Sequence, residues 1–176
     1  NIISTELKYN ISERINTTAN FTFQNLDKNL FSELDDSDNN SIATFFEFDY
    51  LIFKNKKIQI SSRNSIEYIN EKYDGVIRYK EVEFDRNWNI SNIIGNQILL
   101  NNQLFLEADE NNFLEYQFQN LRIGNTYSGV KNIGKIKYLK SKTELDINVD
   151  FSNIQAENYS TSLLFYNSNL IKKWKY

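Results

Sequence analysis

The chain of 176 residues contains no cysteine, histidine, proline or methionine, and only five glycines. Without cysteine it has no disulfide framework and no thiol chemistry. Without histidine or cysteine, the common nucleophile–base triads and most zinc sites are excluded. We therefore predict a protein that is not an enzyme, with calcium as the one ion to consider. The missing initiator methionine predicts a processed or truncated amino terminus.

Strong net charge and long apolar runs are missing as well. The formal net charge is −3, which argues against a surface that binds nucleic-acid phosphates. No apolar run approaches the roughly 20 residues of a membrane-spanning helix, so we predict no membrane span. Asparagine and isoleucine are abundant and lysine greatly outnumbers arginine. These residues have AT-rich codons, which favours a bacterial source with an AT-rich genome.

The first fifteen residues alternate with a period of two. Ile3, Leu7, Tyr9 and Ile11 share one side, and the positions between them are polar. Such alternation predicts an extended strand with one apolar face. This strand must pair with a sheet, either in its own domain or in a neighbouring copy.

The same alternation recurs along the rest of the chain, most clearly in Leu145–Phe151. About nine strands are expected, with glycine-containing turns between several of them, which predicts an all-β domain, a β-sandwich or a barrel. Residues 1–15 form the amino-terminal strand in this scheme, and residues 16–176 form the sandwich domain. Asn64–Tyr73 suggests a short helical turn, and Asp74-Gly75 suggests a tight hairpin before a strand containing Phe84.

An acidic loop offers a candidate calcium site. Asp36, Asp38, Asn40 and Glu47 have the ligand offsets of an EF-hand loop. Serine occupies the sixth position, where the sharp turn of that loop needs glycine, and the segment that follows has strand character. The alternative is a solvated acidic loop in an asparagine-rich chain.

Trp88 lies between amide and acidic residues and could stack on a sugar ring. The alternative is that Trp88 closes the edge of the hydrophobic core. A pair of carboxylates could also cleave a glycoside, but no spacing selects two of the available acids, which are Asp49, Glu67, Glu107, Asp109 and Glu110.

The final third of the chain resembles the end of bacterial pilin-like domains of the spore coat protein U and chaperone–usher types. The resemblance rests on Gly134–Tyr138, Leu145–Phe151 and Ala156–Tyr166, where Ala156, Tyr159 and Ser160 fit the closing motif. It implies an immunoglobulin-like β-sandwich that lacks one strand. The amino-terminal extension of a neighbouring subunit would fill the groove by donor-strand complementation.

These observations together predict a structural or adhesive subunit of a bacterial surface fibre, secreted or held at the cell surface and assembled by strand exchange. Ile3, Leu7, Tyr9 and Ile11 would be the assembly residues. The partners would be copies of the chain or related subunits, with a host glycan or protein as receptor. Two alternatives stay open, a carbohydrate-binding β-sandwich module that uses Trp88 and a glycoside-processing enzyme.

Overall fold

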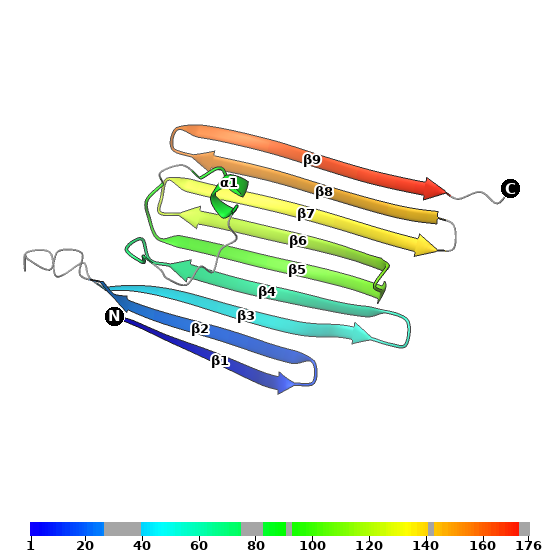
Figure 1. The fold of residues 1–176 in the computed structure, drawn as a ribbon, viewed down its shortest axis with the longest axis horizontal. Helices are drawn as coiled ribbons and strands as arrows, with labels where there is room; N and C mark the ends of the chain where they lie inside the picture. The colour runs from blue at the N-terminus through cyan, green and yellow to red at the C-terminus, as the bar shows by residue number, and fades with distance from the viewer. Residues whose placement is uncertain (27–39, 75–82, 91–92, 141–142, 173–176) are drawn as a thin grey trace, which may run out of the picture.

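Strands make up nearly all of the regular structure in this chain. The computed structural model describes residues 1–26, 40–74, 83–90, 93–140 and 143–172 (Figure 1). In these ranges it has nine strands and one short helix: β1 Ile2–Ser12, β2 Ile15–Asn25, β3 Asn40–Lys54, β4 Gln59–Ile69, α1 Phe84–Asn87, β5 Gln97–Asp109, β6 Asn112–Ile123, β7 Tyr127–Lys140, β8 Thr143–Ala156 and β9 Tyr159–Lys172.

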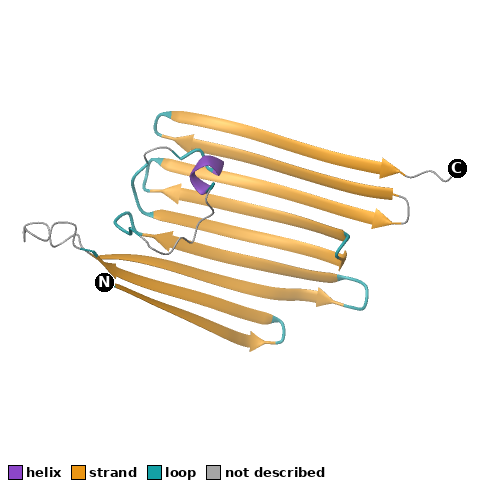
Figure 2. Cartoon of the chain, viewed as in Figure 1, coloured by secondary structure: helices purple, strands orange, loops and turns teal. Residues whose placement is uncertain are grey.

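The nine strands form one antiparallel sheet whose spatial order equals the chain order, β1 to β9. Every strand therefore pairs with the strands directly before and after it in the sequence, and β1 and β9 are the two edges (Figures 1 and 2). The all-β prediction is confirmed. The immunoglobulin-like sandwich is not confirmed, because that fold needs two stacked sheets and the described strands lie in one.

The amino-terminal strand belongs to the sheet of its own chain. β1 pairs with β2 from Ile2 opposite Gln24 to Ser12 opposite Ile15. The Asn1 ammonium also donates a 2.7 Å hydrogen bond to the Asn25 carbonyl oxygen. The predicted division at residue 15 thus falls at the start of β2, inside a β-hairpin. A donor strand reserved for a neighbouring subunit is not confirmed.

The two faces of the sheet differ in their side chains, and the strand register shows which residues lie on each face. Side chains alternate along each strand, and directly paired residues point to the same side. On β5, Leu100 and Leu104 point to one side, which we call the open face. Leu99 and Gln103 point to the other side, which we call the helix face because α1 packs there (Figure 2).

Residues 83–90, from the connection between β4 and β5, lie at one end of the helix face and build the only buried cluster of apolar residues in the described chain. Phe84 and Trp88, from α1 and its carboxyl end, pack onto Leu121, Ile123, Tyr127 and Ile154 of β6 to β8. The Tyr127 hydroxyl donates a 2.5 Å hydrogen bond to the Trp88 carbonyl oxygen. Trp88 is 3% exposed, so this connection fastens its indole tightly to the sheet.

A glycine in β7 makes room for the indole. A Cβ added to Gly129 would lie 2.9 Å from Cζ3 of Trp88, whereas one added to Gly134 would meet nothing within 4 Å. We therefore expect Gly129→Ala to lower the free energy of unfolding by about 1–3 kcal/mol, because the packed ring must move. Gly134→Ala on the same strand is the matched control and should not destabilise the fold. Urea denaturation of both variants tests this, and equal midpoints would contradict it.

Candidate functional site

Burial on the sheet is the reverse of the usual pattern for a globular protein. On β5, the apolar residues Ile98, Leu100, Leu104 and Leu106 are exposed, whereas Asn101 and Gln103 between them are half-buried. An apolar patch of more than a few hundred Å² is uncommon on a monomer and marks an interaction surface. The open face therefore has the character of an interaction surface.

Exposed apolar side chains cover the open face across all nine strands. The register places on it, from β1 to β9, residues that include Ile3, Leu7, Tyr9, Phe21, Phe23, Ile42, Phe46, Tyr50, Ile66, Leu100, Leu104, Leu114, Tyr116, Ile136, Tyr138, Phe151, Leu164, Tyr166 and Leu170. Phe48 and Tyr50 also stack there with ring centroids 6.4 Å apart. The open face is therefore predominantly apolar on all nine strands.

Charge is confined to the rim of the open face. Within the described strands, the charged residues of this face stand only at strand ends: Asp109, Arg122, Lys140 and Lys172. The interior of the face carries aliphatic, aromatic, hydroxyl and amide side chains. A charged group is the most costly kind to bury without a partner, so the open face is suited to being covered.

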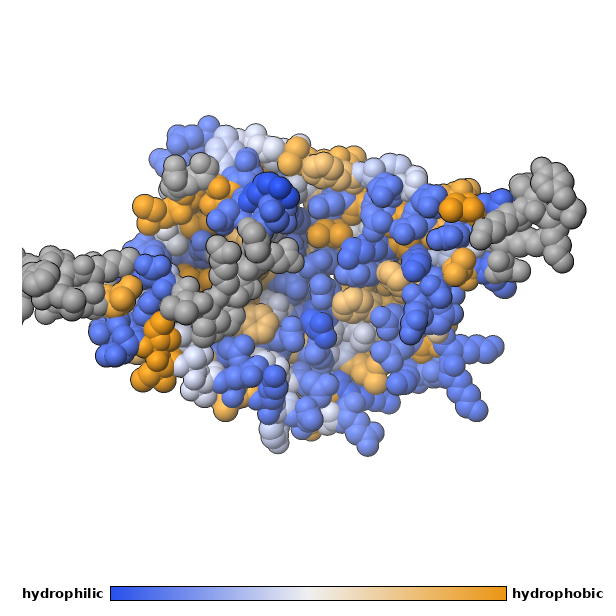
Figure 3. Space-filling view, viewed as in Figure 1, coloured by the Kyte–Doolittle hydropathy of each residue, from blue (hydrophilic) through white to orange (hydrophobic). Residues whose placement is uncertain are grey.

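The helix face carries most of the charge of the sheet, and Figure 3 shows its largely hydrophilic surface. Arg63 of β4 lies 2.7 Å from Asp49 and 3.8 Å from Glu47 of β3. The hydrogen bond that Arg63 donates to Asp49 raises the pKa of Arg63, and the negative charges of Asp49 and Glu47 raise it further, against the opposing effect of its burial. Lys135 pairs with Glu115 at 3.3 Å. This face is thus suited to contact with water.

The edge strands carry the second part of the site. β9 has no charged residue from Tyr159 to Ile171, and Leu163, Leu164, Phe165 and Tyr166 are exposed on both of its faces. β1 is exposed at every position and carries one ion pair, 3.0 Å between Lys8 and Glu6. Soluble proteins usually protect such edges with charge, proline or a covering segment.

The four residues predicted for assembly lie on β1. Ile3, Leu7, Tyr9 and Ile11 are all exposed, and the first three point to the open face by their register with β2. Sequence reasoning missed that every other strand continues this surface. It also missed the exposed run in β9, for which the signal was four consecutive apolar residues within a long uncharged segment.

The predicted calcium ligands do not come together. Asp36 and Asp38 lie outside the described residues. Asn40 and Glu47 both belong to the extended strand β3, which puts them roughly 23 Å apart at 3.3 Å per residue. Because calcium ligands lie at 2.3–2.6 Å from the ion, these two residues cannot ligate one ion, and the four-ligand set is wrong. Glu47 instead lies beside Arg63.

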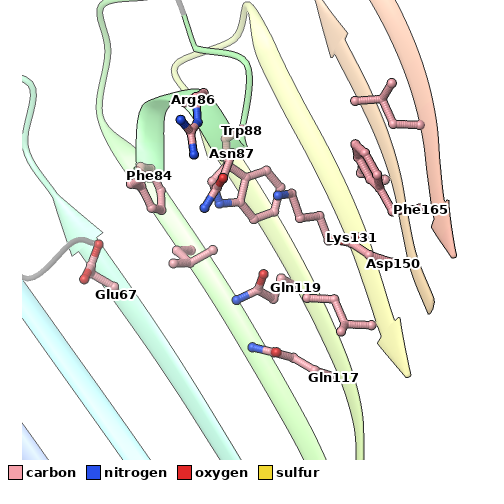
Figure 4. A pocket seen from close by; sticks show the side chains of 14 residues that line it. Glu67, Phe84, Arg86, Asn87, Trp88, Gln117, Gln119, Lys131, Asp150 and Phe165 are labelled. Carbon is pink, nitrogen blue, oxygen red and sulfur yellow. The ribbon is translucent and has the colours of Figure 1, made fainter. Parts of the chain in front are cut away.

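A cavity of about 640 Å³ opens on the helix face beside α1. In Figure 4, Trp88 and Lys131 lie together at one end, with Gln117 and Gln119 along the floor. Lys131 Nζ lies 4.7 Å from the centroid of the Trp88 ring. Oδ1 of Asp150, which also lines the cavity, is buried without a hydrogen-bond partner among the described residues.

The cavity does not present Trp88 to a ligand. The indole is 3% exposed, with Gly129 on one side and the Lys131 ammonium over its ring. A sugar could not stack on it without displacing those contacts, so the glycan role predicted for Trp88 does not fit its burial. The alternative, in which Trp88 closes the edge of the core, matches its place in the buried cluster. The exposed aromatic residue at this cavity is Phe165.

Comparison with known proteins gives no family for this chain. No family model, curated protein or solved structure matches it. In the part of the chain that the structure describes, no helix has both the length and the apolar character to cross a membrane.

Proposed function

We propose that the chain is a structural subunit of a bacterial surface fibre and that its subunits join through the edge strands of their sheets. The edge strand β9, which is uncharged from Tyr159 to Ile171 and exposes a run of apolar side chains, carries this proposal. An edge strand presents a row of backbone N–H and C=O groups, and strand addition satisfies them while apolar side chains pack beside the new pair. Leu163 to Tyr166 supply those side chains on both faces of β9.

Strand addition replaces strand exchange in this proposal because β1 already pairs with β2 of its own chain. A swap would first have to break that pairing. Adding a strand to an existing edge costs no intramolecular hydrogen bond. Ile3, Leu7 and Tyr9 then contribute to assembly in a different way from the predicted donor strand, as side chains that continue the apolar surface across a junction between subunits.

The odd number of strands fixes how the edges can meet. In an antiparallel sheet of nine strands, β1 and β9 run in the same direction (Figure 1). If the open faces stay on one side, β9 can therefore pair antiparallel only with β9 of another copy, and β1 only with β1. Each such junction is isologous, with a twofold axis perpendicular to the sheet. The two junctions in alternation give an unbranched fibre.

A lysine at the β9 edge tests the proposal. Phe165→Lys places a charge on the helix-face side of β9, and across the twofold junction two such charges would repel each other. We expect it to raise the concentration needed for fibre formation at least about tenfold, which corresponds to about 1.4 kcal/mol per junction. Electron microscopy and sedimentation of the full chain provide the readout.

Leu139→Lys is the matched control for this experiment. Leu139 is also an exposed apolar residue on the helix face, but it lies on the interior strand β7. It should assemble like the wild type. Fibres of Phe165→Lys that form at the wild-type concentration would contradict edge pairing through β9, and a wild-type chain that never forms fibres would contradict the function itself.

A further inference from the structure

We propose that the open face packs against the open face of a second copy, so that two chains form a two-layer β-sandwich between them. The occupant is thus this chain itself, and the contact is separate from the edge junctions. The proposal does not depend on fibre formation, because it uses the broad surface of the sheet and not its edges. Exposed area, side-chain chemistry and sheet geometry support it.

The open face is large enough for a stable contact between two chains. With nine strands of eleven or more residues, the open face measures roughly 43 Å by 36 Å, or about 1,500 Å². A standard stable interface buries about 800 Å² per partner. One open face therefore offers nearly twice the area that a stable dimer needs.

The composition of the open face suits a copy of itself. In a twofold contact each central residue lies near the same residue of its partner, so interior charges would repel their own copies. In the described strands, the charged residues of the open face lie only at strand ends. Aliphatic and aromatic residues have no such conflict.

Amides near the middle of the open face favour a protein over lipid as the occupant. The register aligns Asn64 of β4 with Asn102 of β5, and Asn132 of β7 lies in the same row. An amide has both a donor and an acceptor, so it can pair with its own copy across a twofold axis. Asn64 Nδ2 donates a hydrogen bond to Ser62 Oγ, and Asn132 Oδ1 accepts one from the Tyr116 hydroxyl. Lipid tails offer no hydrogen-bond partner and would leave the remaining donors and acceptors of these amides unpaired, at a cost.

The geometry follows the ordinary packing of twisted sheets. Two sheets stack about 10 Å apart with their strands about 30° from parallel. The helix faces, with α1, their ion pairs and the cavity, would remain on the outer surfaces. The alternating pattern that predicted a sandwich within one chain would then be satisfied by two chains.

Sedimentation of a chain blocked at its β9 edge tests the face contact. In Phe165→Lys, which leaves the open face unchanged, we expect a species of at least twice the 20.9 kDa chain mass at micromolar concentration. Adding Leu104→Lys, at a side chain 42% exposed in the isolated chain, should at least halve the mass of that species with unchanged far-UV circular dichroism, whereas a pair joined only through β1 would keep its mass and overturn the proposal. Adding Gln103→Lys, on the helix face one residue away, should leave the mass unchanged. A chain that stays monomeric with the open face unaltered overturns the proposal, whether or not the wild type forms fibres.

Thiol protection provides a second measurement, because the chain has no cysteine of its own. In Asn102→Cys the new thiol lies on the open face, so the dimer should protect it from alkylation. When about 90% of the chains are dimers, the rate of alkylation should be at least about tenfold lower than in the monomer. In Gln103→Cys the rate should not depend on concentration. Equal behaviour of the two variants overturns the proposal. So does protection of Asn102→Cys by phospholipid vesicles at concentrations where the protein is monomeric, because lipid is then the occupant.

Discussion

Trp88→Ala should lower the free energy of unfolding by about 3–5 kcal/mol, the range for removing a large buried aromatic side chain. The indole is the centre of the one buried apolar cluster in the described chain, between Phe84 and the β6–β8 end of the sheet. It also contacts the Lys131 ammonium, and the carbonyl of Trp88 accepts the Tyr127 hydrogen bond. Losing the ring leaves a cavity beneath α1, where it packs onto the sheet.

Far-UV circular dichroism in urea measures this effect at concentrations too low for assembly. Phe165→Ala is the matched control, because Phe165 is also an aromatic residue at the cavity but is 65% exposed. It should change stability by no more than about 0.5 kcal/mol. Similar losses for the two variants would mean that the buried cluster does not hold the sheet, and that strand pairing alone does.

Stability should fall above about pH 10, and Tyr127 should account for part of that fall. Burial raises the pKa of Tyr127 well above its ordinary value, and the nearby Tyr159 adds to the increase. The folded chain therefore favours the neutral phenol. Its stabilising contribution is complete below the unfolded pKa of about 10. Above that pH the unfolded chain releases the proton first, and stability declines by up to about 1.4 kcal/mol per pH unit until the folded pKa is reached.

Tyr127→Phe separates this residue from the other groups that titrate at alkaline pH. Below pH 10 the variant should lose about 1–3 kcal/mol, because the buried Trp88 carbonyl loses its donor. Above pH 10 its stability should decline less steeply than that of the wild type, so the two curves approach each other. Tyr138→Phe, at an exposed tyrosine, should keep the wild-type slope. Parallel curves for Tyr127→Phe and the wild type would contradict the prediction.

Local pattern predicted the strands well because strand alternation is a property of neighbouring residues. Leu145–Phe151 lies within β8 as expected, and the amino-terminal alternation forms β1. Asn64–Tyr73 was wrongly expected to turn as a helix, since β4 extends to Ile69. The segment is too short for its apolar spacing to distinguish the helical period of about 3.6 residues from the strand period of 2.

The remaining errors concern tertiary contacts, which a local sequence pattern does not contain. Phe84 lies in α1 and not in a strand, because the connection after β4 packs onto the sheet through Phe84 and Trp88. Alternation also shows that one side of a strand is apolar, but not whether that side meets a core or remains exposed. Leu100 and Leu121 are both leucines within strands, and nothing in their local sequence separates them. Leu121 is nevertheless fully buried under α1, whereas Leu100 is exposed on the open face.

The agreement between strand order and chain order affects how such a protein can change in evolution. Each strand contacts only its sequence neighbours, so stability is approximately a sum over adjacent pairs, as in repeat proteins. Duplicating or deleting one two-strand hairpin away from the α1 connection would require no other strand to be rerouted. It would widen or narrow the sheet by two strands and keep their number odd. The edges would still run in the same direction, so subunits of different widths could join through the same contacts.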